Sequence, residues 1–363
     1  MKFEIPKFRE PDFDQDFLKN APNCTLEECP EDGISPENYH ALSVYPEYFK
    51  INGKWVLATE SRMDTVAVAI DEEGKEKVNI VEFRNLKKGD KVVIGRTENA
   101  EDGIYMWTKG FESVDSNEDN FAFRSGRSRE TAFSIDYDNL YELLKHEKAN
   151  GGYITWVIGS AVALDKNARD AFEGLVKKGF VDAVFCGNNT AAIDLENGVY
   201  GSTWGQDIFV KEQNTNNNIY ETINLARSYG SMKAFMGSGK VEDGFIKALY
   251  DRDIPVVISC SIRDRLPLPE AYTDVYKAQD AMRAHTRKSS TIIMLSAILF
   301  TIASGNMTPS YNKFNGEIRP VYLYTVDIQE FAVNKLADRG TLTATSIVTN
   351  TQDFLRNVNR SLE

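Results

Sequence analysis

Small and polar residues follow apolar runs at several places in the second half of the chain, and they are the first candidates for chemistry. After the predicted strands they read Gly187, Asn188 and Asn189 (after 181–186), Ser261, Ile262, Arg263 and Asp264 (after 254–260), Ser304, Gly305 and Asn306 (after 291–303), and Asp327 (after 321–326). Glycine and asparagine let a backbone approach a ligand closely. An acid at a strand end can accept both hydroxyls of a ribose. The pattern predicts a cofactor crevice, although Asp327 is equally suited to cap the next helix.

Two other residue types could contribute to such a crevice. A guanidinium matches the geometry of a carboxylate, so Arg263 and the nearby group Arg124, Arg127 and Arg129 could hold a substrate carboxylate. The last three are equally well explained as solvated side chains. Cys186 and Cys260 end apolar runs, where a cysteine either packs as a small hydrophobe or lines the crevice.

The common catalytic motifs are absent from the sequence. There is no GxGxxG dinucleotide fingerprint, P-loop, HExxH or GxSxG. The three histidines, His40, His146 and His285, are far apart, and Cys24 and Cys29 lack a second pair. We therefore predict no metal site.

The elements that must position these residues change in type along the chain. The first 110 residues show short alternating strands and hairpin turns at Asn52-Gly53 and Glu73-Gly74, which predict a small barrel or sandwich. A helix is predicted at 136–149. From Gly151 onward, continuous apolar strands alternate with helices predicted at 165–178, 216–229, 240–250, 271–286 and 329–337 and at the C-terminus, and 291–303 is predicted to supply both a strand and a helix. This alternation predicts a parallel sheet covered on both faces, which binds ligands at the carboxyl ends of its strands.

Length and charge limit the partners. The chain has 363 residues and a formal net charge of −12, which suggests about two domains and argues against a nucleic-acid partner. Residues 1–40 hold ten acidic and four basic residues, which predicts a solvated arm. The start lacks a secretory signal and the apolar run 292–303 is too short to span a bilayer, so we expect a cytoplasmic protein without membrane contact. Four cysteines make no disulfide framework at this length.

Several segments together resemble a known family, the NAD-dependent ornithine cyclodeaminases, also described as lysine-oxoglutarate reductase/saccharopine dehydrogenase-like. The family occurs as an archaeal enzyme and as the C-terminal part of cyanobacterial arginine dihydrolase fusions. The resemblance runs from about Pro30 to Val358. Its segments are PEDGISP at 30–36, FKINGKWV at 49–56, Met63-Asp64, GFVDAVFCGN at 179–188, SIRDRLPLPEAYTDVYKAQDAMR at 261–283, ASGNM at 303–307, and VDI with KLADRGT within 326–341.

The resemblance implies a fold and a chemistry. It implies an α/β protein with an N-terminal β-rich domain and a C-terminal parallel-sheet NAD-binding domain akin to deoxyhypusine synthase. On this chain that gives an acidic arm at 1–30, a β-rich domain at 31–120, a connecting segment and helix at 121–150, and the NAD domain at 151–363. Family members use bound NAD to take a hydride from the α-carbon of ornithine, close the ring with loss of ammonia, and return the hydride. We expect a homodimer or homotetramer acting on an amino acid.

The matched segments also give candidate roles. Asp264 and Asp194 would carry protons beside Cys260. Substrate contacts would come from Arg263, Arg124, Arg127, Arg129 and Asp64. Cofactor contacts would come from Gly187, Asn188, Asn189, Asp194, Ser261, Ile262, Gly305, Asn306, Asp327, Asp338, Gly340 and Thr341.

The chain departs from the family where proton carriers are expected. Ile193 and Tyr45 stand where the family typically has histidine, 214–220 lacks the usual histidines, and Arg265 replaces an acid. Histidine is the usual proton carrier near neutral pH. We therefore expect a divergent paralogue with the same cofactor and an altered substrate or outcome. An opine- or imine-type reductase and a degenerate NAD-binding regulatory protein are the alternatives.

Overall fold

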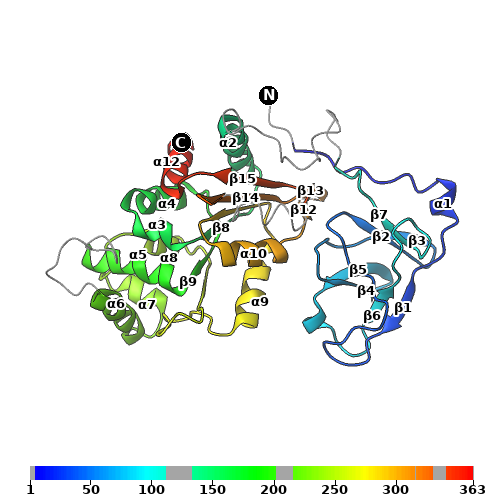
Figure 1. The fold of residues 1–363 in the computed structure, drawn as a ribbon, viewed down its shortest axis with the longest axis horizontal. Helices are drawn as coiled ribbons and strands as arrows, with labels where there is room; N and C mark the ends of the chain where they lie inside the picture. Colours follow the sequence, from blue (N-terminus) through cyan, green and yellow to red (C-terminus); the bar gives the residue numbers. More distant parts are fainter. Residues whose placement is uncertain (1–4, 112–132, 202–215, 315, 330–340, 363) are drawn as a thin grey trace.

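The computed structural model describes residues 5–111, 133–201, 216–314, 316–329 and 341–362. An N-terminal β-rich part, blue to cyan in Figure 1, lies beside a larger α/β part that carries the C-terminus. The change of pattern along the sequence therefore corresponds to a change of architecture.

The N-terminal part is built from two antiparallel sheets. Their strands are β1 (Thr25–Glu28), β2 (Glu47–Ile51), β3 (Lys54–Leu57), β4 (Val66–Glu72), β5 (Lys75–Val81), β6 (Lys91–Ile94) and β7 (Ile104–Met106), with a 3-10 turn η1 (Phe83–Asn85). The sheet orders are β1-β6-β4-β5 and β3-β2-β7. Asn52 and Gly53 both have positive φ, at 48° and 80°, as a two-residue hairpin turn requires. The two predicted hairpins, β2–β3 and β4–β5, are confirmed.

Both sheets contribute to one apolar core. Phe49 from β2 and Ile104 from β7 are fully buried against Ala67, Ile80 and Val93 from the other sheet. Two sheets that share a core in this way form a small sandwich, one of the two architectures expected from the sequence.

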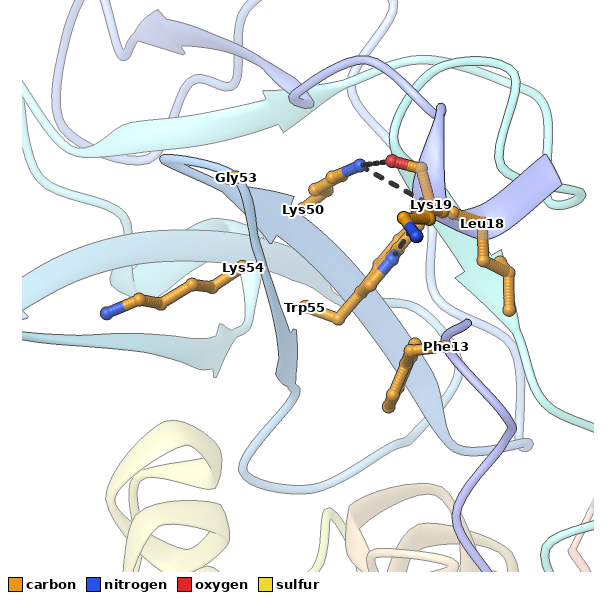
Figure 2. Close-up of a pocket in the computed structure, with 7 residues that line it drawn as sticks. All are labelled: Phe13, Leu18, Lys19, Lys50, Gly53, Lys54 and Trp55. Carbon is orange, nitrogen blue, oxygen red and sulfur yellow. Dashed lines mark hydrogen bonds between the residues drawn. The ribbon is translucent and has the colours of Figure 1, made fainter. Parts of the chain in front are cut away.

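The N-terminal segment is packed onto this sandwich, so the expectation of a solvated arm is wrong from Leu18 onward. Leu18, in the short helix α1 (Asp16–Lys19), is fully buried. The Lys50 ammonium donates to the carbonyls of Leu18, Lys19 and Ala21 at 3.2, 2.8 and 2.8 Å, and Figure 2 shows the first two of these bonds. Strand β1 then pairs with β6. Aromatic residues and the buried lysine hold the segment despite its negative charge.

The α/β part contains a six-stranded parallel sheet. Its elements in chain order are α2 (Phe133–Ala149), β8 (Ile154–Ile158), α3 (Ser160–Leu164), α4 (Lys166–Lys178), β9 (Ala183–Gly187), α5 (Asn188–Tyr200), α6 (Asn216–Ser228), α7 (Met232–Gly237), α8 (Phe245–Asp251), β10 (Val256–Ser259), α9 (Val275–Thr286), β11 (Thr291–Leu295), α10 (Ile298–Met307), β12 (Tyr311–Phe314), β13 (Glu317–Pro320), β14 (Tyr322–Asp327), β15 (Ala344–Val348) and α12 (Thr351–Ser361). The order is β10-β9-β8-β11-β14-β15, and all pairs are parallel. The predicted parallel sheet is confirmed.

Helices cover both faces of the sheet, as its continuous apolar strands predicted. On one face, Ile293 and Leu295 pack in a core with residues of α2, α4, α5, α8 and α12. On the other face, Ile292 and Met294 pack against α9 and α10. Successive residues of one strand thus enter two different cores. Helix α2 belongs to the first core and is not merely a connection.

Several predicted elements differ in detail. The helix expected at 240–250 is α8, which begins at Phe245, and α7 precedes it. Helix α5 and the β12–β13 hairpin were not predicted. The helix expected at 329–337 lies almost entirely outside the described residues. Across the residues that the structure describes, no helix has the length and apolar character needed to cross a membrane.

A buried ion pair fixes three helices beneath the sheet. Arg169 of α4 and Asp194 of α5 are both fully buried, and Arg169 Nε donates to Asp194 Oδ1 at 2.7 Å. Asp194 also accepts the backbone N–H of Ile246 at 2.9 Å, at the start of α8. Burial raises the pKa of Asp194 to about 6, although Arg169 and the backbone N–H groups lower it.

We expect Arg169→Met to destabilise the fold by roughly 3–5 kcal/mol, because it leaves a buried carboxylate without its cation. The pKa of Asp194 would then rise further above that of an ordinary aspartate. A folded state that holds the proton more tightly than the unfolded chain loses stability as pH rises through this range. Urea unfolding should therefore show a larger loss at pH 8 than at pH 5.

The matched control is Lys166→Met on the same helix, which removes an exposed pair with Asp170. Surface pairs contribute about 1 kcal/mol or less. Equal, pH-independent losses in the two variants would contradict the assigned role of Arg169.

Candidate functional site

The order of the parallel sheet places a crevice between β8 and β11. Chain connections run outward from β8 in one direction and from β11 in the other, so the order reverses between these two neighbouring strands. Open α/β sheets bind ligands at such a reversal, beyond the carboxyl ends of the strands. Helix α5 begins directly after β9, and α10 begins three residues after β11, so both helices begin at this edge.

Two loops meet closely at the reversal. Gly159 follows β8, and its N–H donates to Leu295 O at 2.9 Å. A Cβ on Gly159 would lie 2.0 Å from the carbonyl oxygen of Ser296, so only glycine fits. Ser296 has φ of 46°, a conformation that non-glycine residues rarely adopt and that often marks functional sites. Sequence reasoning missed Gly159, although a glycine directly after a continuous apolar strand was an available signal.

Hydroxyl groups line the same edge. Ser160 Oγ lies 3.2 Å from Thr190 Oγ1, and Ser296 Oγ contacts Thr351 Oγ1. A Cβ on Gly187 would meet nothing closer than 3.9 Å, so space remains above β9. Backbone and hydroxyl groups of this kind can hold the polar parts of a nucleotide.

Asn188 connects two of the predicted strand ends. Its side chain is buried and donates to Asp264 Oδ1 at 3.3 Å and to Leu266 O at 3.1 Å. Its oxygen accepts the N–H of Leu268 at 2.8 Å. The amide therefore holds the loop after β10 in place, and Asn189 beside it is half-buried.

The loop after β10 presents an oriented carboxylate. Asp264 Oδ2 accepts from the N–H and the hydroxyl of Ser261 at 2.6 and 2.9 Å. Arg263 and Ile262 are exposed, and among the described residues no hydrogen bond or ion pair engages the Arg263 guanidinium. The structure thus brings Asn188, Ser261 and Asp264 together, with Arg263 at the open side.

Cys260 lies half-buried at the start of that loop. Burial, and the neighbouring Asp264 carboxylate, raise the pKa of Cys260 above its usual value. The thiol is therefore protonated at neutral pH, which makes it a poor nucleophile or base. Cys186 is fully buried in the apolar core, as expected for a packing residue.

Asp194 is not at the crevice surface, and the prediction of an accessible proton carrier there is wrong. It is fully buried, with Arg169 and the start of α8 as partners. Ile193 beside it is also fully buried in the apolar core. In this chain the position at which the family typically has histidine is therefore a packing position.

Gly305 and Asn306 do not follow a strand, so that expectation is also wrong. Strand β11 ends at Leu295, and both residues lie in the last turn of α10, which spans Ile298–Met307. Helix α10 returns toward the start of β14. Its last turn is therefore near the amino ends of the strands, away from the crevice.

Asp327 ends β14 and is nearly buried. Its Oδ1 accepts the N–H of Gln329 at 2.9 Å, which is the capping contact that the sequence allowed. Its Oδ2 makes no hydrogen bond to the part of the chain that the structure describes, and a ribose role stays a prediction. Thr341 is half-buried and contacts the N–H of Thr343 at 3.4 Å. Asp338, Gly340, Arg124, Arg127 and Arg129 lie outside the described residues.

Asp64 lies far from the other predicted substrate residues. It is exposed, and the adjacent Ser61 carbonyl accepts the N–H of Ser310, which itself bonds Val321 just before β14. Asp64 is thus near the amino ends of the strands, whereas Arg263 follows a carboxyl end. A five-residue strand spans about 16 Å. Within one chain, Asp64 and Arg263 therefore lie at opposite edges of the sheet, and a substrate contact by Asp64 stays a prediction.

A pocket of about 320 Å³ lies on the N-terminal part, away from this crevice. Phe13, Leu18, Lys19, Lys50, Gly53, Lys54 and Trp55 line it (Figure 2). The Lys50 ammonium is used by backbone carbonyls, and Trp55 Nε1 donates to Leu18 O at 3.2 Å. These contacts hold the N-terminal segment and leave the pocket without a free buried polar group. Over the described ranges, no group of three or more potential metal ligands gathers.

Comparisons with known proteins agree on one group. A model of the C-terminal Rossmann fold of ArgZ-like arginine dihydrolases matches residues 138–358, and a model of the first part of that C-terminal region matches residues 46–129. The ornithine cyclodeaminase of Methanococcus maripaludis is 30% identical over 347 residues, which are 94% of this chain and 80% of that protein. The enzyme of the same name from Methanocaldococcus jannaschii is 31% identical over 93% of this chain and 77% of its own length.

Solved structures lead to the same group. A LOR/SDH protein of Methanococcus maripaludis has a TM-score of 0.78 and 29% identity, covering 95% of this chain and 98% of that one. A ternary complex of AgrE with ornithine and NAD⁺ has a TM-score of 0.58 and 26% identity, covering 94% of this chain and 46% of AgrE. This chain thus spans less than half the length of AgrE. A deoxyhypusine synthase of Entamoeba histolytica reaches a TM-score of only 0.35 at 10% identity, too little to support the expected kinship.

We expect Gly159→Ala to destabilise the fold by about 1–3 kcal/mol, because its Cβ would force the Ser296 loop away. The control is Gly187→Ala, at another strand end, where the added Cβ has room. That change should shift stability by no more than about 0.5 kcal/mol. Urea unfolding midpoints measure both. Equal effects would show that the close approach does not constrain the crevice.

Proposed function

The chain belongs to the family formed by the C-terminal regions of ArgZ-like arginine dihydrolases, together with archaeal ornithine cyclodeaminases, and we propose that it is an NAD-dependent enzyme acting on an amino acid. The observation that carries the proposal is the likeness to AgrE, whose structure with ornithine and NAD⁺ aligns with 94% of this chain. The reversal of strand order at Gly159 supports it, because such a crevice is where α/β sheets bind dinucleotides.

The residues at the crevice fit a dinucleotide. The open space at Gly187 lets a ligand approach the backbone after β9, whereas the space beside Gly159 is filled by the Ser296 carbonyl. The N-terminus of α5 would favour the pyrophosphate, and the unused oxygen of Asp327 would accept ribose hydroxyls. NAD, when bound, supplies a reversible acceptor for the hydride of a Cα–H bond.

The loop after β10 would form the side of the crevice that contacts the substrate. Arg263 is exposed there with a guanidinium that no described residue engages, and it would bind the substrate carboxylate. Asp264 is oriented by Ser261 and Asn188, and it would hold or move the proton of the substrate amine. Arg124, Arg127 and Arg129 stay candidate partners of the carboxylate.

The proposed reaction is ornithine cyclodeamination or a related change at a Cα–N bond. The departures from the family fall partly at buried positions such as Ile193, so they do not remove a proton carrier from the crevice surface of this chain. Arg265, in the loop itself, adds a positive charge where the family has an acid. That change favours a substrate side chain other than the cationic one of ornithine.

A homo-oligomer is part of the proposal. Large apolar side chains are exposed beyond several strand ends, with exposed fractions of 106% for Ile262, 73% for Leu299 and 68% for Ile328. Exposed apolar groups at one edge are typical of ligand or subunit contacts.

Acid denaturation of the purified protein should release NAD, and incubation with ornithine, lysine and other diamino acids should deplete one of them, as followed by mass spectrometry. A cyclic imino acid plus ammonia, with no net change in cofactor, supports cyclodeamination. Reduced cofactor forming in step with a keto acid, or NADH consumed with a keto acid and an amine, assigns a dehydrogenase or an opine-type reductase instead. If the protein releases no NAD and turns over none of these compounds, the proposal of an enzyme is contradicted.

We expect Asp264→Asn to lower kcat by about 10²–10⁴-fold, because an amide cannot exchange a proton with the substrate. Bound NAD and the unfolding midpoint should change little, since the amide keeps one oxygen acceptor. The control is Asp253→Asn, an exposed surface position paired with Lys233. Unchanged kcat in Asp264→Asn would remove Asp264 from the proposed chemistry.

A further inference from the structure

Seven charged residues gather where the N-terminal sandwich contacts helix α9. We call them the interdomain cluster, and they are Glu60, Arg62, Glu82, Arg84, Asp280, Arg283 and Arg287. The first four come from the N-terminal part, and the last three from α9 and its C-cap. The cluster takes no part in the proposed reaction.

Each carboxylate of the interdomain cluster serves more than one guanidinium. Glu82 Oε1 pairs with Arg62 Nη1 at 2.9 Å and also with Arg283 Nη2, and its Oε2 pairs with Arg84 Nε at 3.2 Å. Glu60 Oε1 pairs with Arg62 Nε at 3.1 Å and with Arg287 Nη2 at 3.0 Å. Both glutamates are therefore already shared between guanidiniums.

Asp280 completes the set from the α9 side. Its Oδ1 pairs with Arg84 Nη2 at 2.8 Å and with Arg283 Nη1 at 3.2 Å. Four guanidiniums thus share three carboxylates, and no other acid in the described part of the chain pairs with them. Counted over these ion pairs, the cluster has one positive charge in excess, and the Asp274 carboxylate at the start of α9 is near enough to Arg84 for that guanidinium to lower its pKa without pairing with it.

Two guanidinium nitrogens of the cluster are buried and unused. They are Arg62 Nη2 and Arg283 Nε, on side chains that are only 2% and 7% exposed. Buried charged donors without acceptors are costly. Burial, Arg62 and Arg287 lower the pKa of Arg283 to about 10, which still leaves it charged at neutral pH.

The other buried arginine cluster of the chain is balanced differently. Arg169 lies between two carboxylates, Asp194 and Asp243, at 2.7 and 2.6 Å. Its surroundings therefore hold more negative than positive charge. Arg319 and Glu147 form a further buried pair with one charge of each sign, so within the described ranges the buried arginines outside the interdomain cluster carry no positive surplus.

We propose that the interdomain cluster binds one small oxyanion between the two parts of the chain. The anion supplies the missing negative charge and accepts the unused guanidinium N–H groups. Guanidiniums bind phosphate and carboxylate oxygens with matching geometry, so inorganic phosphate and a small carboxylate are the two sources of the same chemistry. Contacts from both sides would join the N-terminal sandwich to α9.

The test measures the thermal unfolding midpoint and the calorimetric binding of the full chain, with sodium chloride replaced by sodium phosphate or sodium acetate at constant ionic strength. We expect a saturable rise of the midpoint with at least one of the two anions, and a stoichiometry of one anion per chain. A response to phosphate alone or to acetate alone assigns the source. No saturable response to either anion would overturn the proposal, because water would then satisfy the cluster.

The decisive variant is Arg287→Gln, which removes the surplus charge at a side chain that is 47% exposed. We expect anion affinity to fall about tenfold or more, while the midpoint without added anion stays the same or rises. Arg84→Gln, at 26% exposure, is the second variant if the first does not fold. Arg96→Gln is the matched control, an exposed arginine that contacts only the Asn38 amide among the described residues. Equal anion responses in Arg287→Gln, Arg96→Gln and the unaltered protein would also overturn the proposal.

Discussion

The close approach of Gly159 and Ser296 is the constraint on which the crevice depends. Strands β8 and β11 are neighbours, yet their connections leave in opposite directions. The loops that follow them must therefore start side by side and then separate. The loop after β8 has Gly159, which lacks a Cβ, at the contact, and the loop after β11 has Ser296 with a positive φ. Everything placed at the carboxyl ends, including α5 and the Asp264 loop, is arranged around this point.

Much of the fold could be predicted because short stretches of sequence indicate the type of each strand, helix or turn. Continuous apolar runs such as Thr291–Leu295 indicated a sheet covered on both faces, and Asn52-Gly53 indicated a hairpin. The end of a strand within a longer apolar run could not be predicted. The apolar run from Thr291 continues through α10, because β11 is buried on both faces and α10 packs against one of them, so the sequence places Gly305 and Asn306 at the end of the whole run and not at the end of the strand. Within a run that is apolar throughout, hydrophobicity alone does not show where the two-residue repeat of a strand ends and the 3.6-residue repeat of a helix begins.

The sequence predicted which residue types form the candidate site, but not which partners each side chain contacts. Asp194 and Asp264 look alike in the sequence, as acids near predicted strand ends. Arg169, which precedes Asp194 by 25 residues, forms a buried ion pair with it. Ser261, three residues before Asp264, instead donates to Asp264 and orients it in the exposed loop. A contact between distant segments decides which acid can meet a substrate. The position of Asp64 could not be predicted either, because no local sequence pattern indicates that the sandwich packs near the amino ends of the sheet strands.

Helix α9 links the interdomain cluster to the crevice. Its inner side packs against the sheet through Met282, and its outer side is held by the sandwich through Arg283. The loop that carries Asp264 is thus fixed by β10 before it, by α9 after it, and by Asn188 in its middle. A carboxylate held from three sides keeps its orientation without a substrate present, and such preorganisation is what proton transfer at a defined atom requires. The sandwich therefore contributes to the crevice through the helix it holds, although its own Asp64 lies at the opposite edge.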